Sequence, residues 1–272
     1  MPSIYAHNKF GKFVISKLPK ETKEVIRKYP RSFRIGLQGP DFLFFYRAFS
    51  KNKVNQIGVY YHHHDIYPFM EHACGVIQKY GTDSSQYSYI LGFICHFALD
   101  NACHPYVNVA MKQTGCGHVE IEGDLDQFIL ASEDYVPECY PLDALVPTDM
   151  ETAKSIKPFY SELSIQTIQS SLKWMRFIKR FFVAPGIWKR SIIDLFMHAT
   201  MHYKRLNGHV VQPTANRKCR KETKHLYRLL KNAVPDAVGL INDFNKTLEG
   251  HNMSNAFHKD FNGTIFSNKN RN

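Results

Sequence analysis

The segment Cys95-His96-Phe97-Ala98-Leu99-Asp100-Asn101-Ala102-Cys103-His104-Pro105 lies within a long apolar stretch from Ser84 to about Met111. Helical periodicity in this stretch predicts an α-helix, on which residues four apart, here His96, Asp100 and His104, share one face. Pro105 disfavours helical backbone at the preceding residue, which predicts that His104 lies just past the last turn. Ionisable groups are costly to bury unless they are paired or bound to metal. The segment therefore predicts either a hydrogen-bonded His–Asp pair in the core or a set of metal ligands.

A second histidine and a carboxylate follow closely, in His118-Val119-Glu120-Ile121-Glu122. Taken alone, the four-residue spacing of His118 and Glu122 is common and is typical of a surface pair. The short connection 112–117 could place this segment antiparallel to the first, which would bring five potential ligands together. Histidine nitrogen with carboxylate oxygen is a combination that zinc favours.

Three more candidate ligands lie upstream. Asp41 ends the motif Gly39-Pro40-Asp41 and precedes a very apolar segment, so it is either a helix N-cap or a ligand. His62-His63-His64-Asp65 holds three consecutive histidines, which cannot all face one site. His7 lies close to the amino terminus.

In this order, the motifs resemble the zinc-dependent phospholipase C family, whose fold is shared with the S1/P1-type nucleases. They cover about residues 1–125. The resemblance implies an all-α, single-domain helical bundle of the phospholipase C / P1 nuclease type. It also implies a trinuclear site with two to three Zn²⁺ per chain, and the family pattern favours His62 over His63 and His64.

The resemblance also implies how the ligands are shared among the ions. One zinc would take Asp41, His62, His96 and Asp100. A second would take His104, His118 and Glu122. The third would share Asp100 as a bridge and would use His7 with the amine and carbonyl of the amino terminus.

The implied activity is hydrolysis of phosphate esters by a metal-activated hydroxide. Asp41, besides its role as a ligand, could accept a proton from the attacking water. The expected substrate is a phospholipid or another phosphodiester, cleaved at the head group as by a phospholipase C. A nuclease or 3′-nucleotidase acting on nucleic acid could use the same three zinc ions, and it would need an aromatic side chain for base stacking. A non-catalytic, zinc-stabilised binding module is the third alternative, and closed four-ligand sites would indicate it.

Further helices are predicted over 149–154, 173–182, 187–206, 222–230 and 235–248. In the segment 173–182, apolar residues recur at helical spacing, and the other face carries Lys173, Arg176, Lys179 and Arg180. The cationic, aromatic segment 173–190 could make peripheral contact with an anionic membrane surface, or it could be an ordinary amphipathic helix that packs on the core. His198 and His202 are four apart, but no carboxylate motif accompanies them, so they are interpreted as packing residues.

The length of 272 residues and the hydrophobic content of 44% allow one sizeable core. We predict one helical domain over residues 1–250 and an irregular tail over 251–272. The net charge of +11 favours anionic partners. The amino terminus does not resemble a secretory signal and no apolar run approaches the ~18 residues of a transmembrane segment, so a cytoplasmic protein is expected.

Overall fold

The computed structural model describes residues 3–48, 50–199 and 206–266. The predicted all-α bundle is confirmed: across these ranges there is no strand, and the only β feature is an isolated bridge between Lys259 and Ile265. The helices are α1 (Ile4–Lys17), α2 (Lys20–Lys28), α3 (Pro30–Gly36), α4 (Lys53–His63), α5 (Tyr67–Tyr80), α6 (Ser85–Thr114), α7 (His118–Ser132), α8 (Met150–Ile156), α9 (Ile165–Phe182), α10 (Ile187–Ala199), α12 (Arg220–Asn232) and α13 (Val234–Leu248).

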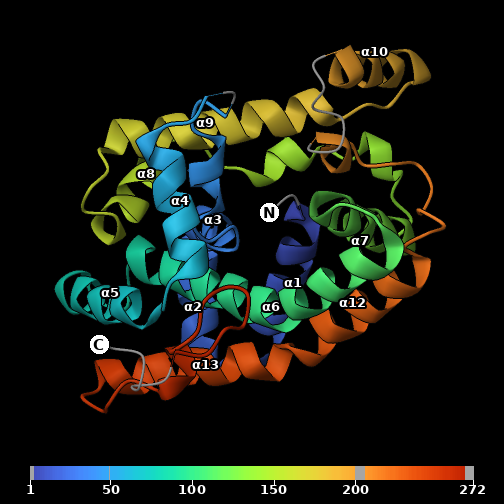
Figure 1. The fold of residues 1–272 in the computed structure, drawn as a ribbon. Helices are drawn as coiled ribbons and strands as arrows, with labels where there is room; N and C mark the ends of the chain where they lie inside the picture. The colour runs from blue at the N-terminus through green and yellow to red at the C-terminus, as the bar shows by residue number, and fades with distance from the viewer. Residues whose placement is uncertain (1–2, 49, 200–205, 267–272) are drawn as a thin grey trace.

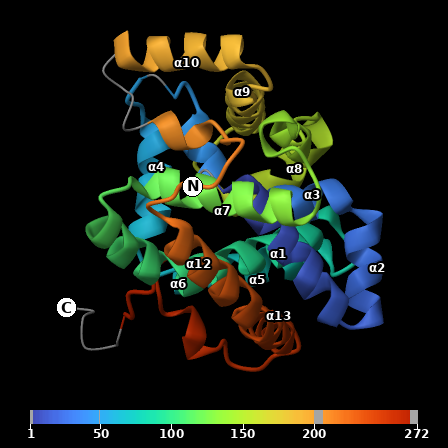
Figure 2. The same ribbon diagram turned by 90° about the vertical axis from the view of Figure 1, so that its right-hand side faces the viewer.

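Helix α6 crosses the middle of the molecule, with α9 towards one end and α13 towards the other (Figure 1, Figure 2). Ser84 caps its start by accepting a hydrogen bond from the backbone N–H of Tyr87 at 3.1 Å. Its end is set by Gly115, which adopts a left-handed φ of 71° that glycine tolerates best. Apolar side chains lie on all sides of α6, as expected for a helix buried in a large core.

The helix does not end at the proline. Helix α6 continues through Pro105 to Thr114, so the prediction that His104 lies just past the last turn is wrong. A proline inside a helix costs roughly 3 kcal/mol in its lost hydrogen bond and its steric clash. Packing outweighs this cost, because Cys103, Val107 and Ala110 on either side of Pro105 are buried.

Two glycines bring α3 into backbone contact with α6. A Cβ atom on Gly36 would lie 2.2 Å from the carbonyl oxygen of Tyr89, and one on Gly92 would lie 2.3 Å from that of Phe33. Only glycine permits so close an approach. The contact holds the turn that follows α3, with the Gly39-Pro40-Asp41 motif, directly against α6.

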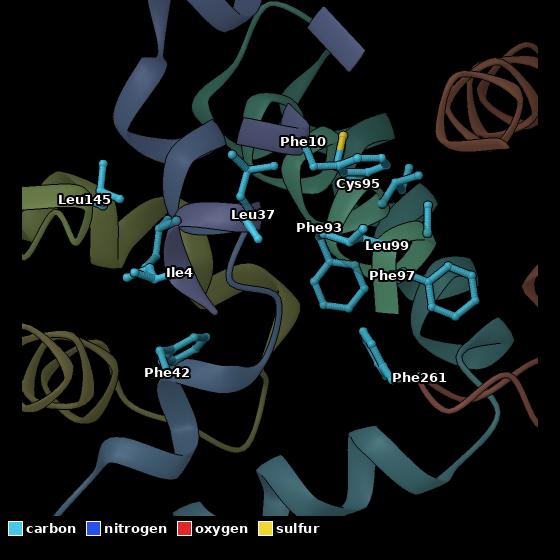
Figure 3. Close-up of a cluster of buried hydrophobic side chains, with 14 of the residues drawn as sticks. Ile4, Phe10, Leu37, Phe42, Phe93, Cys95, Phe97, Leu99, Leu145 and Phe261 are labelled. Atoms are coloured by element: carbon cyan, nitrogen blue, oxygen red, sulfur yellow. The ribbon is translucent and has the colours of Figure 1, made fainter. Parts of the chain in front are cut away.

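The core joins elements that are distant in sequence. Figure 3 shows a cluster of buried side chains from α1, from the segment after α3, from α6, from the 3₁₀ turn η3 (Leu142–Leu145) and from the chain near its carboxyl end. The labelled members are Ile4, Phe10, Leu37, Phe42, Phe93, Cys95, Phe97, Leu99, Leu145 and Phe261. Burial of such a set is the main favourable contribution to folding.

The described part of the carboxyl-terminal segment, to residue 266, packs on the helical body. Phe257 and Phe261 are completely buried. Asn262 donates a hydrogen bond from its amide nitrogen to the carbonyl oxygen of His62 at 3.1 Å. The division into a domain over 1–250 and a tail over 251–272 stays a prediction. No helix among the described residues combines the length and apolar character that a membrane span needs.

Candidate metal centre

Three groups of potential ligands converge around the middle of α6. His96 and Asp100 are fully buried, and His104 is 3% exposed. The Nε2 atom of His96 lies 3.3 Å from Oδ2 of Asp100, and Nε2 of His104 lies 3.7 Å from Oδ1. One helix face thus places a carboxylate between two imidazoles, as the four-residue spacing predicts.

The first group adds Asp41 and His62 to His96. Asp41 is the first residue of the 3₁₀ turn η1 (Asp41–Phe45), and the N-cap position before it is occupied by Pro40, so Asp41 is not the N-cap of this turn. Its Oδ1 atom lies 2.8 Å from Nε2 of His62 and 3.9 Å from Nε2 of His96. Of the three consecutive histidines, His62 is the buried one, whereas His63 and His64 are exposed.

Backbone carbonyls fix the orientation of two of these imidazoles. The Nδ1 atom of His62 lies 2.8 Å from the carbonyl oxygen of Gly58, and that of His96 lies 3.2 Å from the carbonyl oxygen of Leu37. A carbonyl accepts only, so Nδ1 carries the hydrogen in both rings and Nε2 of the neutral ring is left as a lone pair. In His62 that lone pair faces an Asp41 oxygen, which is repulsive unless a cation lies between them. Metal-ligating histidines typically have such a second hydrogen bond.

The second group joins His104 of α6 with His118 and Glu122 of α7. Oε1 of Glu122 lies 3.4 Å from Nε2 of His104 and 3.2 Å from Nε2 of His118. The side chain of His118 is 31% exposed, in contrast to 4% for Glu122. Solvent therefore reaches the ligand set at His118.

The third group joins His7 of α1 with His96 and Asp100. The Nε2 atom of His7 lies 3.3 Å from Oδ1 of Asp100, and its ring stacks on that of His96 with 4.5 Å between ring centroids. The expected contribution of the amine and carbonyl of the amino terminus concerns residues 1–2, which lie outside the described residues.

Asp126 of α7 holds the start of α1, and so sets the position of His7. Its Oδ1 accepts from the hydroxyl of Ser3 at 2.9 Å and from the backbone N–H of Ala6 at 2.7 Å, and its Oδ2 accepts from that of Tyr5 at 3.1 Å. A carboxylate from a distant helix thus performs the function of an N-cap, because α1 has no capping side chain of its own.

The buried polar atoms fit a set of metal ions. Several have no hydrogen-bond partner: Nδ1 of His7, Nε2 of His62, Nε2 of His96, both carboxylate oxygens of Asp100 and Oε2 of Glu122. Unsatisfied carboxylates and imidazoles in a core are costly, whereas metal ions would satisfy them together. The donor set of five imidazoles and three carboxylates is of the kind that zinc prefers.

The charges around these residues favour ionised carboxylates. Burial alone would raise the pKa of Glu122, but His118 and His104 beside it hold that pKa well below its ordinary value. Burial lowers the pKa of His96 to about 4, so its ring is neutral at pH 7. A neutral imidazole and an ionised carboxylate are the forms that bind a metal ion.

Gly39 of the Gly39-Pro40-Asp41 motif lies against the ring of His96. It has a φ of +49°, and a Cβ atom there would lie 2.1 Å from Cδ2 of that ring. We expect Gly39→Ala to displace His96, to lower the free energy of unfolding by roughly 2 kcal/mol and to remove zinc from the group of His96, Asp41 and His62. Elemental analysis and chemical denaturation test this. Gly81→Ala is the matched control, because Gly81 also has a positive φ, of +78°, with no atom within 4 Å of its Cβ position. Equal zinc content in both variants would contradict the expectation.

Lys179 is the residue near the site that the sequence pattern placed wrongly. It is predicted on the polar face of its helix, yet it is 2% exposed and lies on the inner side of α9, with Nζ 5.8 Å from the ring centroid of Phe45. Burial lowers its pKa to about 8, against the opposing effect of Asp126, Asp41 and Glu122. The sequence spacing could have predicted this burial, because Lys179 follows the buried residues Ile168, Leu172 and Met175 at steps of three and four.

The carboxyl-terminal segment also supplies an unpredicted residue to the site. The ring of Phe261 lies 4.9 Å from that of His62 and 5.4 Å from that of His96, measured between centroids. It closes one side of the ligand set against water. The sequence feature that could have predicted this packing is a pair of phenylalanines four residues apart, Phe257 and Phe261, in a largely polar segment.

Comparisons with known proteins give one relationship. The sequence profile described as "Zinc dependent phospholipase C" matches residues 6–185, which include all eight candidate ligands. No curated protein and no solved structure matches the chain. The match covers well over half of the 272 residues, and the clustered His, Asp and Glu side chains agree with it. The chain therefore belongs to the zinc-dependent phospholipase C family, whose members are hydrolases.

Proposed function

We propose that the protein cleaves phospholipids at the head group with two to three zinc ions, held by the eight side chains of the three ligand groups. The observation that carries this proposal is the convergence of the groups on one buried helix face, where His96 belongs to two groups and Asp100 lies within 4 Å of His7, His96 and His104. Structural zinc sites rarely require adjacent ions that share ligands.

In this proposal the residues divide as the family resemblance implies. Asp41, His62, His96 and Asp100 would hold one ion, His104, His118 and Glu122 a second, and His7 with Asp100 would contribute to a third. When bound, zinc lowers the pKa of a coordinated water, polarises a phosphoryl oxygen and offsets the negative charge of the transition state.

The side chains themselves provide order and access. The backbone carbonyls of Gly58 and Leu37 accept hydrogen bonds from Nδ1 of His62 and His96, and so orient these rings with Nε2 available to bind a metal ion. The group of His104, His118 and Glu122 offers three ligands only, and it includes the partly exposed His118. A zinc ion held by these three side chains would have a position for water or substrate, which favours catalysis over a purely structural role.

Asp41 has a second role in the proposal. Its carboxylate is fully buried beside His62 and His96, so an oxygen that is not bound to metal would accept a proton from the attacking water. A phosphodiester is anionic, and the positive net charge of +11 favours its approach.

The metal content is the first test. We expect elemental analysis to find two to three zinc ions per chain after zinc-replete purification. A chelator should lower the melting temperature by roughly 10 °C or more, because the facing carboxylates and imidazoles then lack a counter-ion. One zinc or none per chain would contradict the proposed site.

The substrate is tested with a panel assayed on zinc-replete enzyme: phosphatidylcholine, other phospholipids, single-stranded DNA and nucleoside 3′-monophosphates. We expect release of diacylglycerol from at least one phospholipid. Preferential cleavage of DNA or of the nucleoside monophosphates would identify a nuclease or 3′-nucleotidase instead. Zinc binding without hydrolysis of any of these substrates would support the third alternative, a non-catalytic, zinc-stabilised binding module.

A further inference from the structure

Helix α10 presents an apolar face to solvent. Four large side chains at its start and along one side are strongly exposed: Ile187 at 75%, Trp188 at 82%, Ile192 at 67% and Leu195 at 71%. Trp188, Ile192 and Leu195 follow one another at steps of four and three residues, so they form a single stripe. Scattered apolar residues are ordinary on a surface, but a continuous stripe of this size indicates an interaction.

The opposite side of α10 is already used for packing. Ile193 is 2% exposed and Met197 is completely buried. A helix that is apolar on both faces is expected to be covered on both, and here only one is covered by the body of the protein. The outer stripe therefore has no role in the fold of the described residues.

The neighbouring helix continues the apolar surface. Phe177 is 56% exposed and Phe181 is 40% exposed on α9, and their rings stack with 6.4 Å between centroids. Both views show α9 and α10 at the same end of the molecule, with α10 outermost and away from the helices below it (Figure 1, Figure 2).

Basic residues are interspersed with these apolar residues along the sequence of α9 and the start of α10. Residues 173–199 contain six basic side chains and one acidic one, Asp194. Among the basic residues, Lys173, Arg176, Arg180 and Lys189 are exposed. Long cationic side chains beside exposed tryptophan, leucine and isoleucine are typical of helices that lie in the interface of an anionic membrane.

We propose that α10 and the outer face of α9 form a lipid-docking surface, which seats the protein on a phospholipid membrane with anionic head groups. A second copy of the chain is the less suitable occupant. A two-fold dimer through this face would bring the same cations together from both copies, and their repulsion opposes association. The inference rests on the proposed function, because a phospholipase must bind a lipid surface. It identifies the part of the protein that contacts that surface.

The test uses Trp188 as its own probe. The chain has two tryptophans, so Trp174→Phe leaves Trp188 as the only one. Zinc-replete protein of this background is mixed with vesicles of phosphatidylcholine alone or with phosphatidylglycerol added. We expect a blue shift of Trp188 emission and quenching by brominated acyl chains, both stronger with the anionic vesicles.

A matched pair of variants locates the surface. Ile192→Asn should weaken partition into anionic vesicles about ten-fold, because an apolar side chain no longer leaves water. Ile265→Asn is the control: Ile265 is equally exposed, at 68%, but belongs to the carboxyl-terminal segment, far from α10. Vesicle co-sedimentation measures partition, and thermal unfolding verifies that both variants fold.

Several outcomes would overturn the inference. They are absence of vesicle binding by the wild-type protein, equal losses in the two variants, and a blue shift that grows with protein concentration without vesicles, which would show that a second copy covers the stripe. Failure of the proposed function gives a different result. If the protein binds vesicles in a manner that depends on Ile192 but hydrolyses no phospholipid, the lipid-docking surface is supported and the proposed phospholipase activity is contradicted.

Discussion

Asp100→Asn is expected to lower kcat/KM for phosphoester hydrolysis on the order of 10³-fold and to reduce the zinc content by more than one ion per chain. The two oxygens of Asp100 lie within 4 Å of nitrogen atoms of His7, His96 and His104. An amide has the same shape but no negative charge to share between cations. Two ion sites should therefore weaken together, which no other single ligand change is expected to produce.

Elemental analysis and steady-state kinetics measure this effect on the same preparations. His198→Ala is the control, because His198 is an exposed histidine on α10, where its Nδ1 lies 2.8 Å from the carbonyl oxygen of Asp194. It should retain the zinc content of the wild-type protein. If the two variants lose equal amounts of zinc, the assignment of Asp100 as a shared ligand is wrong.

Asp126→Asn is expected to lower the free energy of unfolding by roughly 2–4 kcal/mol and to weaken zinc binding at His7. The carboxylate accepts hydrogen bonds from Ser3, Tyr5 and Ala6 at the start of α1. An amide must turn its N–H₂ group towards at least one of these donors and leave it unsatisfied in the core. His7 follows in the first turns of α1, so a loosened helix start displaces this ligand from Asp100.

A second aspartate on α7 provides the control. Asp124 is also buried, and it accepts from the backbone N–H of Asn216, which precedes α12, at 2.7 Å and from the hydroxyl of Thr223, in the first turn of α12, at 2.6 Å. Asp124→Asn should reduce stability without removing zinc. Chemical denaturation and elemental analysis compare the two. Loss of zinc in both variants alike would show a general effect of unfolding rather than the positioning of His7.

The sequence alone determines the parts of the site that depend on local geometry. His96, Asp100 and His104 share a face, as do His118 and Glu122, because an α-helix repeats every 3.6 residues whatever surrounds it. The helices predicted over 84–111 and 235–248 are present as α6 and α13 for the same reason. The family pattern favours His62 among the three adjacent histidines, and His62 is the one of these three that is buried.

Other features depend on contacts between segments far apart in the chain, and only the tertiary structure decided them. Lys179 carries a charge on an amphipathic helix, which predicts exposure, but the packing of α9 against η1 turns it inwards. Pro105 remains within α6 because buried neighbours outweigh its local cost. Asp126 caps a helix that begins 122 positions earlier, at Ile4, and Phe261 returns to His62 from the end of the chain. Local periodicity cannot predict such contacts, because they contribute to stability only when distant segments of the chain are packed together.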